Sequence, residues 1–147
     1  MKRFTRVVSL VLVLVLLVSN LAILASAYDV NSGSSGCATS RTYKVYHTWG
    51  TAVKLSRYAK GTARDVLGTS YSCYGKYTYT VKNSSGKQIA SGTWYGDRNS
   101  SATLVGATKS TGYYTITVSA VKMDTTKYPA LGSGSYWKTY PKYKISW

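Results

Sequence analysis

The 147-residue chain contains no glutamate, only four aspartates, one histidine and one phenylalanine. The aspartates are scattered along the sequence, and no spacing suggests that two of them converge. Hydrolysis by paired carboxylates needs such a convergence, and a Ser-His-Asp triad would depend on His47 alone. A zinc site is equally poorly supplied by two cysteines and one histidine. We therefore expect a protein without catalytic residues, without a metal and without a cofactor.

The N-terminal segment has the three parts of a secretory signal peptide. Lys2, Arg3 and Arg6 form its basic start, residues 7–18 are almost entirely apolar, and residues 25–27 (Ala-Ser-Ala) fit a signal-peptidase site. The apolar stretch is also long enough for an uncleaved membrane anchor, which is the alternative. We predict cleavage, and hence a secreted protein.

The predicted mature chain is small and strongly basic. Loss of residues 1–27 removes three cations and no acid, so the net charge falls from +15 to +12. We expect residues 28–36 to be a flexible polar lead-in and residues 37–147 to form a single domain. Leu, Ile and Val supply only 15 of the 120 mature residues, whereas all 15 Tyr and all four Trp lie there. We therefore predict a core of Val, Tyr and Trp, because aromatic side chains bury large areas.

Alternation of apolar and polar residues predicts strands with one buried face. The clearest stretches are 71–82, 113–121 and 136–147, and Asn83–Gly86 predicts a hairpin turn before a return strand at about 87–95. Shorter strands are expected at 42–48, 52–58, 63–68 and 102–105. The pattern favours an all-β fold, a small antiparallel β-sandwich of immunoglobulin-like type with about seven strands, and a small barrel is the alternative. Residues 110–119 (STGYYTITVS) resemble the penultimate strand of exported bacterial immunoglobulin-like modules.

The two cysteines, Cys37 and Cys73, are an even number in a chain predicted to be exported. Such cysteines usually pair, so we expect a Cys37–Cys73 disulfide. The bridge would stabilise the fold by roughly 3–4 kcal/mol through the closed loop. Two separate thiols are the alternative.

The candidate binding surface is a basic face that carries tyrosine rings. Alternation places seven side chains on the outer side of two strands: Lys76, Lys82, Tyr136, Lys138, Tyr140, Lys142 and Lys144. Lysines attract anionic groups, and tyrosine rings stack on sugars or bases. A large excess of cations over acids favours a binding role over solubility alone, since mixed charges would also keep a sheet soluble.

We expect a secreted, non-catalytic protein of bacterial origin that binds anionic polymers or the cell envelope. The candidate partners are teichoic acid, acidic polysaccharide, nucleic acid and anionic lipid, and the sequence leaves the oligomeric state open. One alternative is an antimicrobial or toxin-like protein that acts on anionic membranes. Another is a carbohydrate-binding matrix module in which Trp49, Trp94 or Trp137 serves as an exposed sugar platform.

Overall fold

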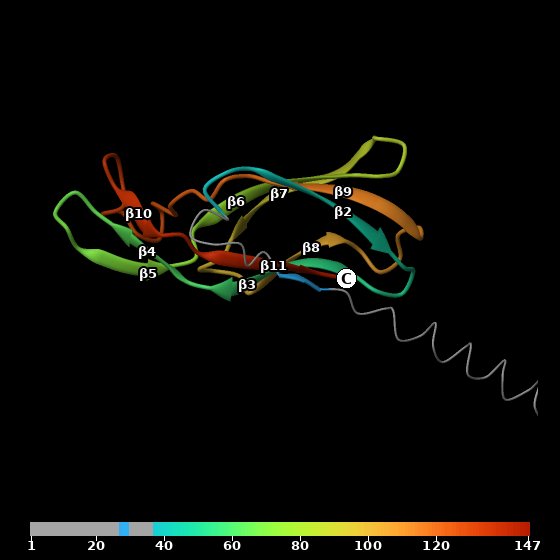
Figure 1. Ribbon diagram of the computed structural model, residues 1–147, viewed down its shortest axis with the longest axis horizontal. Coiled ribbons are helices and arrows are strands. Elements are labelled where there is room, and N and C mark those ends of the chain that lie inside the picture. The colour runs from blue at the N-terminus through green and yellow to red at the C-terminus, as the bar shows by residue number, and fades with distance from the viewer. Residues whose placement is uncertain (1–26, 30–36) are drawn as a thin grey trace, which may run out of the picture.

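The computed structural model describes residues 27–29 and 37–147, which form three antiparallel sheets and, within these ranges, no helix. Figure 1 shows two sheets facing each other as layers, while the third projects from one end of the molecule. Division into separate sheets is consistent with the predicted β-sandwich, because a closed barrel would join its strands in one continuous ladder. Eleven strands are present in the described ranges, more than the seven or so expected.

The first layer has the strand order β2-β9-β6-β7. Its strands are β2 (Arg41–His47), β6 (Lys76–Lys82), β7 (Gln88–Tyr95) and β9 (Gly112–Val118). The predicted hairpin is confirmed: β6 and β7 pair across the Asn83–Gly86 turn, in which the Asn83 carbonyl oxygen accepts the Gly86 N–H at 2.9 Å. This layer thus consists of strands that the alternation of residues predicted.

The second layer has the order β1-β11-β3-β8, and the small end sheet has the order β10-β4-β5. The second layer contains β1 (Ala27–Asp29), β3 (Val53–Ala59), β8 (Ser101–Val105) and β11 (Lys142–Ser146). The end sheet contains β4 (Gly61–Arg64), β5 (Ser70–Cys73) and β10 (Tyr136–Thr139).

The main core between the two layers is built around aromatic rings, as the composition predicts. Tyr77 stacks on Trp94 with ring centroids 5.5 Å apart, and its other neighbour Tyr143 meets it edge-on at 5.2 Å. Val, Ile and Leu side chains fill the remaining space. A smaller core of Ala63, Cys73 and Leu131 lies beneath the end sheet.

Two stretches that alternate as single strands are each divided between two sheets. Residues 71–82 form β5 and β6, which are separated at Gly75, where the backbone takes a positive φ of 76°. A Cβ at Gly75 would lie 2.7 Å from the Lys122 carbonyl oxygen, so the junction requires glycine. Residues 136–147 form β10 and β11, and Pro141, which has no backbone N–H to donate to a ladder, lies at their junction.

The expected disulfide is wrong. Cys37 and Cys73 are both free and buried, Cys37 in the main core and Cys73 in the small core beneath the end sheet. The reason is the change of sheet at Gly75, which directs residues 70–73 away from the core that contains Cys37. The even number of cysteines therefore led to a wrong prediction of a disulfide.

The predicted signal peptide lies outside the described residues except for Ala27. Strand β1 pairs antiparallel with β11, with Tyr28 opposite Ile145 and Asp29 opposite Lys144, so the start of the predicted lead-in is a strand. Residues 30–36 also lie outside the described ranges. Across residues 27–29 and 37–147, no helix has the length and apolar character needed to cross a membrane.

Candidate anion-binding face

The three aspartates whose side chains are described all act within the fold. Oδ1 of Asp65 accepts the backbone N–H groups of Leu67 and Thr69 at 3.0 and 2.8 Å, and Oδ2 accepts the Tyr71 hydroxyl. Burial opposes ionisation of Asp65, but these hydrogen bonds outweigh it and hold the pKa of the carboxyl below its ordinary value. Asp65 is therefore a turn-forming residue.

Asp97 holds the junction between sheets, and Asp124 pairs with Arg98, the residue that follows Asp97. Oδ2 of Asp97 accepts the N–H groups of Tyr74 and Gly75 at 2.8 and 2.9 Å, where the chain leaves β5 for β6. Asp124 is buried and forms a bidentate pair with Arg98. Arg98–Asp124 is the one ion pair within residues 37–147. The three described aspartates thus support loops and turns.

The seven predicted binding residues do not share one face. Lys76 and Lys82 lie on β6 of the first layer, Lys142 and Lys144 on β11 of the second layer, and the others on or next to β10 of the end sheet. The outer faces of the two layers point in opposite directions (Figure 1). Alternation holds along β11, but the register of β10 is irregular between Trp137 and Thr139, so that Lys138 and Thr139 are both exposed. The change of sheet at Pro141 further separates Tyr140 from Lys142.

Pairing across the first layer creates a row that sequence reasoning missed. Thr115 on β9 lies opposite Lys44 of β2 on one side and opposite Lys82 of β6 on the other. Neighbouring strands lie about 4.8 Å apart, so the two lysines originate about 10 Å from each other. Lys44 and Lys82 are exposed, and none of the four strands of this layer contains an acidic residue.

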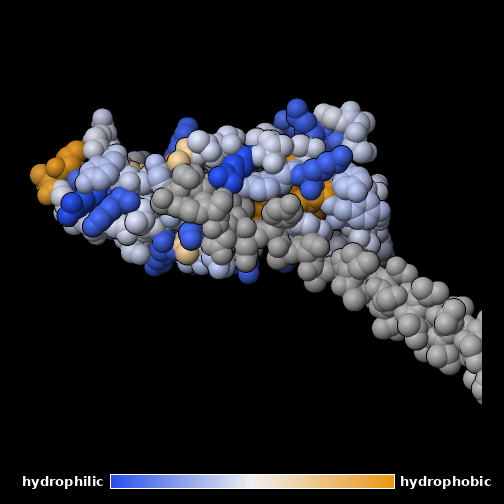
Figure 2. Space-filling view, in the orientation of Figure 1, coloured by the Kyte–Doolittle hydropathy of each residue, from blue (hydrophilic) through white to orange (hydrophobic). Residues whose placement is uncertain are grey.

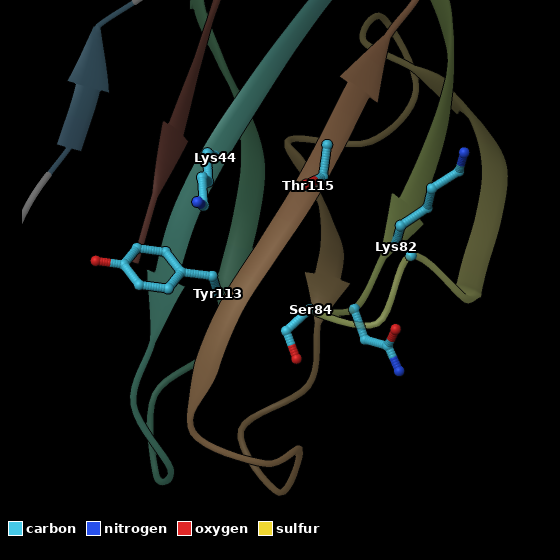
Figure 3. Close-up of a pocket in the computed structure, with 7 residues that line it drawn as sticks. Lys44, Lys82, Ser84, Tyr113 and Thr115 are labelled. Atoms are coloured by element: carbon cyan, nitrogen blue, oxygen red, sulfur yellow. The ribbon is translucent and has the colours of Figure 1, made fainter.

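A pocket of about 350 Å³ lies over this row. It is lined by Lys44, Lys82, Asn83, Ser84, Gly86, Tyr113 and Thr115. Figure 3 shows Lys44 and Tyr113 on one side, Lys82 on the other, Thr115 on the strand between them, and Ser84 on the adjoining turn. Two ammonium groups, hydroxyl groups and a side-chain amide therefore surround a hollow large enough for a phosphate or carboxylate and part of its polymer.

Tyrosine rings extend the pocket toward the end of the layer. The Nζ of Lys44 lies 4.7 Å from the centroid of the Tyr113 ring, a cation–π contact. Tyr113 also meets Tyr46 edge-on at 5.0 Å, and both rings are about half exposed. The Lys44 ammonium is thereby positioned by a neighbouring ring.

A second row on the same face consists of hydroxyl side chains. Thr117 lies opposite Thr42 and Thr80, and Thr80 lies opposite Ser91, so one row crosses all four strands. The Oγ1 atoms of Thr42 and Thr117 lie 3.0 Å apart. This row runs beside the Lys44–Thr115–Lys82 row, and we name the two together the candidate anion-binding face.

The tryptophans predicted as sugar platforms have three different environments. Trp49 is 68% exposed. Trp94 is buried, and its Nε1 donates to the Asn99 carbonyl oxygen at 3.1 Å. Trp137 is partly buried against both cores. Trp49 alone of these three is positioned as a platform.

His47 and the two thiols lie in the interior. The ring nitrogens of His47 lie 3.1 and 2.8 Å from the carbonyl oxygens of Ser110 and Thr51, so the ring links β2 to two loops. Burial raises the pKa of both thiols, that of Cys73 to about 11, which disfavours the thiolate needed for nucleophilic attack or metal binding. No group of three potential metal-ligating residues gathers in the described part of the chain.

Comparison of the chain with known protein families, characterised proteins and solved structures finds no match.

Proposed function

We propose that this protein is a secreted, non-catalytic binding protein that holds an anionic polymer on its candidate anion-binding face. The observation that carries the proposal is the row Lys44–Thr115–Lys82, which places two exposed cations about 10 Å apart on a layer without acids. Repeated anionic groups along a polymer match such a row, and charge attraction strengthens where no carboxylate competes for the lysines.

The composition of the face favours a polymer that carries hydroxyl groups as well as anionic groups. Thr42, Thr117, Thr80 and Ser91 offer donors and acceptors beside the lysines, and the Tyr113 ring offers a surface for sugar stacking. Teichoic acid and acidic polysaccharide combine both kinds of group. Nucleic acid and anionic lipid serve as competing ligands in the test.

The test is binding of poly(glycerol phosphate), a uronic-acid polysaccharide, single-stranded DNA and anionic vesicles at two salt concentrations. The double variant Lys44→Gln/Lys82→Gln should bind its polymer about tenfold more weakly, on the scale of two surface ion contacts. The slope of log affinity against log salt concentration should also be less steep, by about one for each lysine removed.

The matched control is Lys54→Gln/Lys109→Gln. Lys54 lies on β3 of the opposite layer and Lys109 in the β8–β9 loop, and both are exposed. This variant loses the same charge and should retain most of the binding. An equal loss of affinity in both double variants would show that net charge alone governs binding. It would refute the assignment of polymer binding to this face.

We also propose that the protein is exported and that its sandwich is of the immunoglobulin-like type. The basic, apolar and small-residue order of residues 1–27 supports a cleaved leader. Cleavage after Ala27 would keep Tyr28 and Asp29 paired with β11. N-terminal sequencing of protein released by the producing cells should begin at Tyr28, and a product that retains residues 1–27 would contradict export by cleavage.

Sugar binding at Trp49 is the second candidate function. The exposed Trp49 follows β2, and its backbone N–H donates to Thr111 just before β9, so it lies at the end of the layer that carries Tyr46 and Tyr113. A neutral polysaccharide that quenches Trp49 fluorescence, with loss of the effect in Trp49→Ala, would support this function. Binding limited to anionic polymers would reject it.

A further inference from the structure

The hairpin between β4 and β5 ends in two large aliphatic side chains that face solvent. Val66 is 67% exposed and Leu67 is 89% exposed. Figure 1 places this hairpin at one end of the long axis, and Figure 2 shows an apolar patch at that end. A buried core is the usual place for such side chains, so their presentation at a tip requires an explanation.

The tip is held rigidly by hydrogen bonds. Asp65 accepts the N–H groups of Leu67 and Thr69 through its carboxylate, and its backbone carbonyl accepts the Gly68 N–H at 3.1 Å. Nε of Arg64 donates to the Gly68 carbonyl oxygen at 2.9 Å. The apolar side chains therefore project from a preordered turn, which reduces the entropy lost when the tip binds.

Amphipathic and cationic side chains lie behind the tip. Tyr136 of β10 pairs with Arg64 of β4, so both project from the outer side of the end sheet, and Lys138 lies two residues further along β10. Tyr136 is 53% exposed. Asp65, the acid of this hairpin, is buried with its carboxylate turned into the loop. The side chains are thus aliphatic at the tip, with Tyr136 and Arg64 together at the next level and Lys138 further back.

An aliphatic tip backed by an aromatic ring and cations matches the layers of a phospholipid surface. Hydrocarbon accepts aliphatic groups, the interface favours tyrosine, and anionic headgroups attract lysine and arginine. A second protein fits less well, because a stable interface needs about 800 Å² from each partner and the tip offers two side chains. We propose that Val66 and Leu67 insert into a bilayer that contains anionic phospholipids, with Tyr136 at the interface and Arg64 and Lys138 near the phosphates.

The test is a Leu67→Cys variant of the full chain that carries an environment-sensitive dye. Cys37 and Cys73 are buried, so the dye should react at the introduced thiol. Vesicles of phosphatidylcholine with phosphatidylglycerol should blue-shift the emission and raise it several-fold. Because the dye reports its own surroundings, attachment through another segment would leave this signal unchanged.

Thr108→Cys with the same dye is the matched control, since Thr108 is exposed in the β8–β9 loop, away from the end sheet. Its emission should not shift. Val66→Ser in the Leu67-labelled protein should weaken vesicle affinity about tenfold. Lys138→Gln should weaken binding to anionic vesicles, and Lys54→Gln should not.

Three results would overturn the proposal. The emission at position 67 could stay aqueous on anionic vesicles. The dyes at positions 67 and 108 could shift equally, which would indicate general adsorption. The dye at position 67 could shift without vesicles as protein concentration rises, which would indicate self-association. The Lys44→Gln/Lys82→Gln variant should retain the vesicle response, so failure of the polymer proposal and failure of this one are distinguishable.

Discussion

The hydroxyl groups of Tyr43 on β2 and Tyr143 on β11 lie 2.9 Å apart and join the two layers across the core. Tyr143 is buried, and its ring packs edge-on against Tyr77. The Tyr77 hydroxyl is buried without a hydrogen-bond partner among the described residues. Two neighbouring core tyrosines therefore differ in whether their hydroxyl group is paired.

This difference predicts opposite effects of the same substitution. Tyr143→Phe should lower the free energy of unfolding by about 1 kcal/mol, because it removes a hydrogen bond between layers. Tyr77→Phe should leave stability unchanged or raise it by up to about 1 kcal/mol, because it removes an unpaired buried polar group. Urea denaturation measures both. Equal losses of unfolding free energy in the two variants would contradict the difference in hydrogen bonding between Tyr143 and Tyr77.

The junction at Gly61 should be intolerant of any side chain. A Cβ there would clash with the Pro141 nitrogen and lie 2.5 Å from the Thr139 carbonyl oxygen, so backbone would have to move. Gly61→Ala should cost about 3 kcal/mol, at the upper end for overpacking, or prevent folding. Gly106 has open space around it and no positive φ, so Gly106→Ala is the control. It should be neutral or stabilising by up to about 1 kcal/mol in thermal or urea denaturation.

The buried thiols should react only when the protein unfolds. Burial raises the pKa of Cys73 from its ordinary value to about 11, with Asp97 adding to the effect. At pH 8 a thiol reagent should modify two cysteines in denaturant and almost none in the native protein. Absence of free thiols after denaturation under non-reducing conditions would show that a disulfide exists after all.

Cys73 should also make stability depend on alkaline pH. The folded state keeps the Cys73 thiol protonated to a higher pH than the unfolded state does. The stabilisation that comes from this difference is therefore complete below pH 9 and declines as pH rises toward 11. The loss should reach the order of 2 kcal/mol. Cys73→Ala should show a shallower decline over this range, and an identical decline would assign the effect to other groups.

The Asp65 turn should persist in acid. Its folded pKa lies below the ordinary value of 3.8, so its contribution to stability is complete above that value and is lost as pH falls through the folded pKa. The NMR shifts of the Leu67 and Thr69 amide protons should titrate with a midpoint below pH 3.8. Asp65→Asn should abolish this titration, and a midpoint above 3.8 would contradict the hydrogen bonds.

Local alternation was sufficient to locate most strands. Residues 113–118 alternate in burial as their sequence predicts, the predicted alternation fails at Ala120 and Val121, and the Asn83–Gly86 turn joins β6 to β7. The scarcity of acids also followed from composition alone. The use of Asp65, Asp97 and Asp124 as internal hydrogen-bond acceptors did not, because their partners include backbone groups that carry no sequence signal.

The candidate site was located only in part. Lys82 was identified on the outer side of its strand, but its partner Lys44 lies 38 positions away in the sequence and joins it through β9. The grouping of Lys82 with Lys144 was wrong because these residues belong to opposite layers. Exposure of Val66 and Leu67 was also missed, since two aliphatic residues after a short strand fit a buried continuation equally well.

The sequence by itself determined the all-β character, the excess of positive charge, the aromatic core and the hairpin turn. Each of these depends on residue type or on neighbours within a few positions. Only the tertiary structure decided that the chain changes sheets at Gly75 and Pro141, that Cys37 and Cys73 lie in different cores, and that Lys44 and Lys82 share a row. The period of two fixes which side of a strand a residue occupies, but pairing between distant strands decides where that side faces in the molecule.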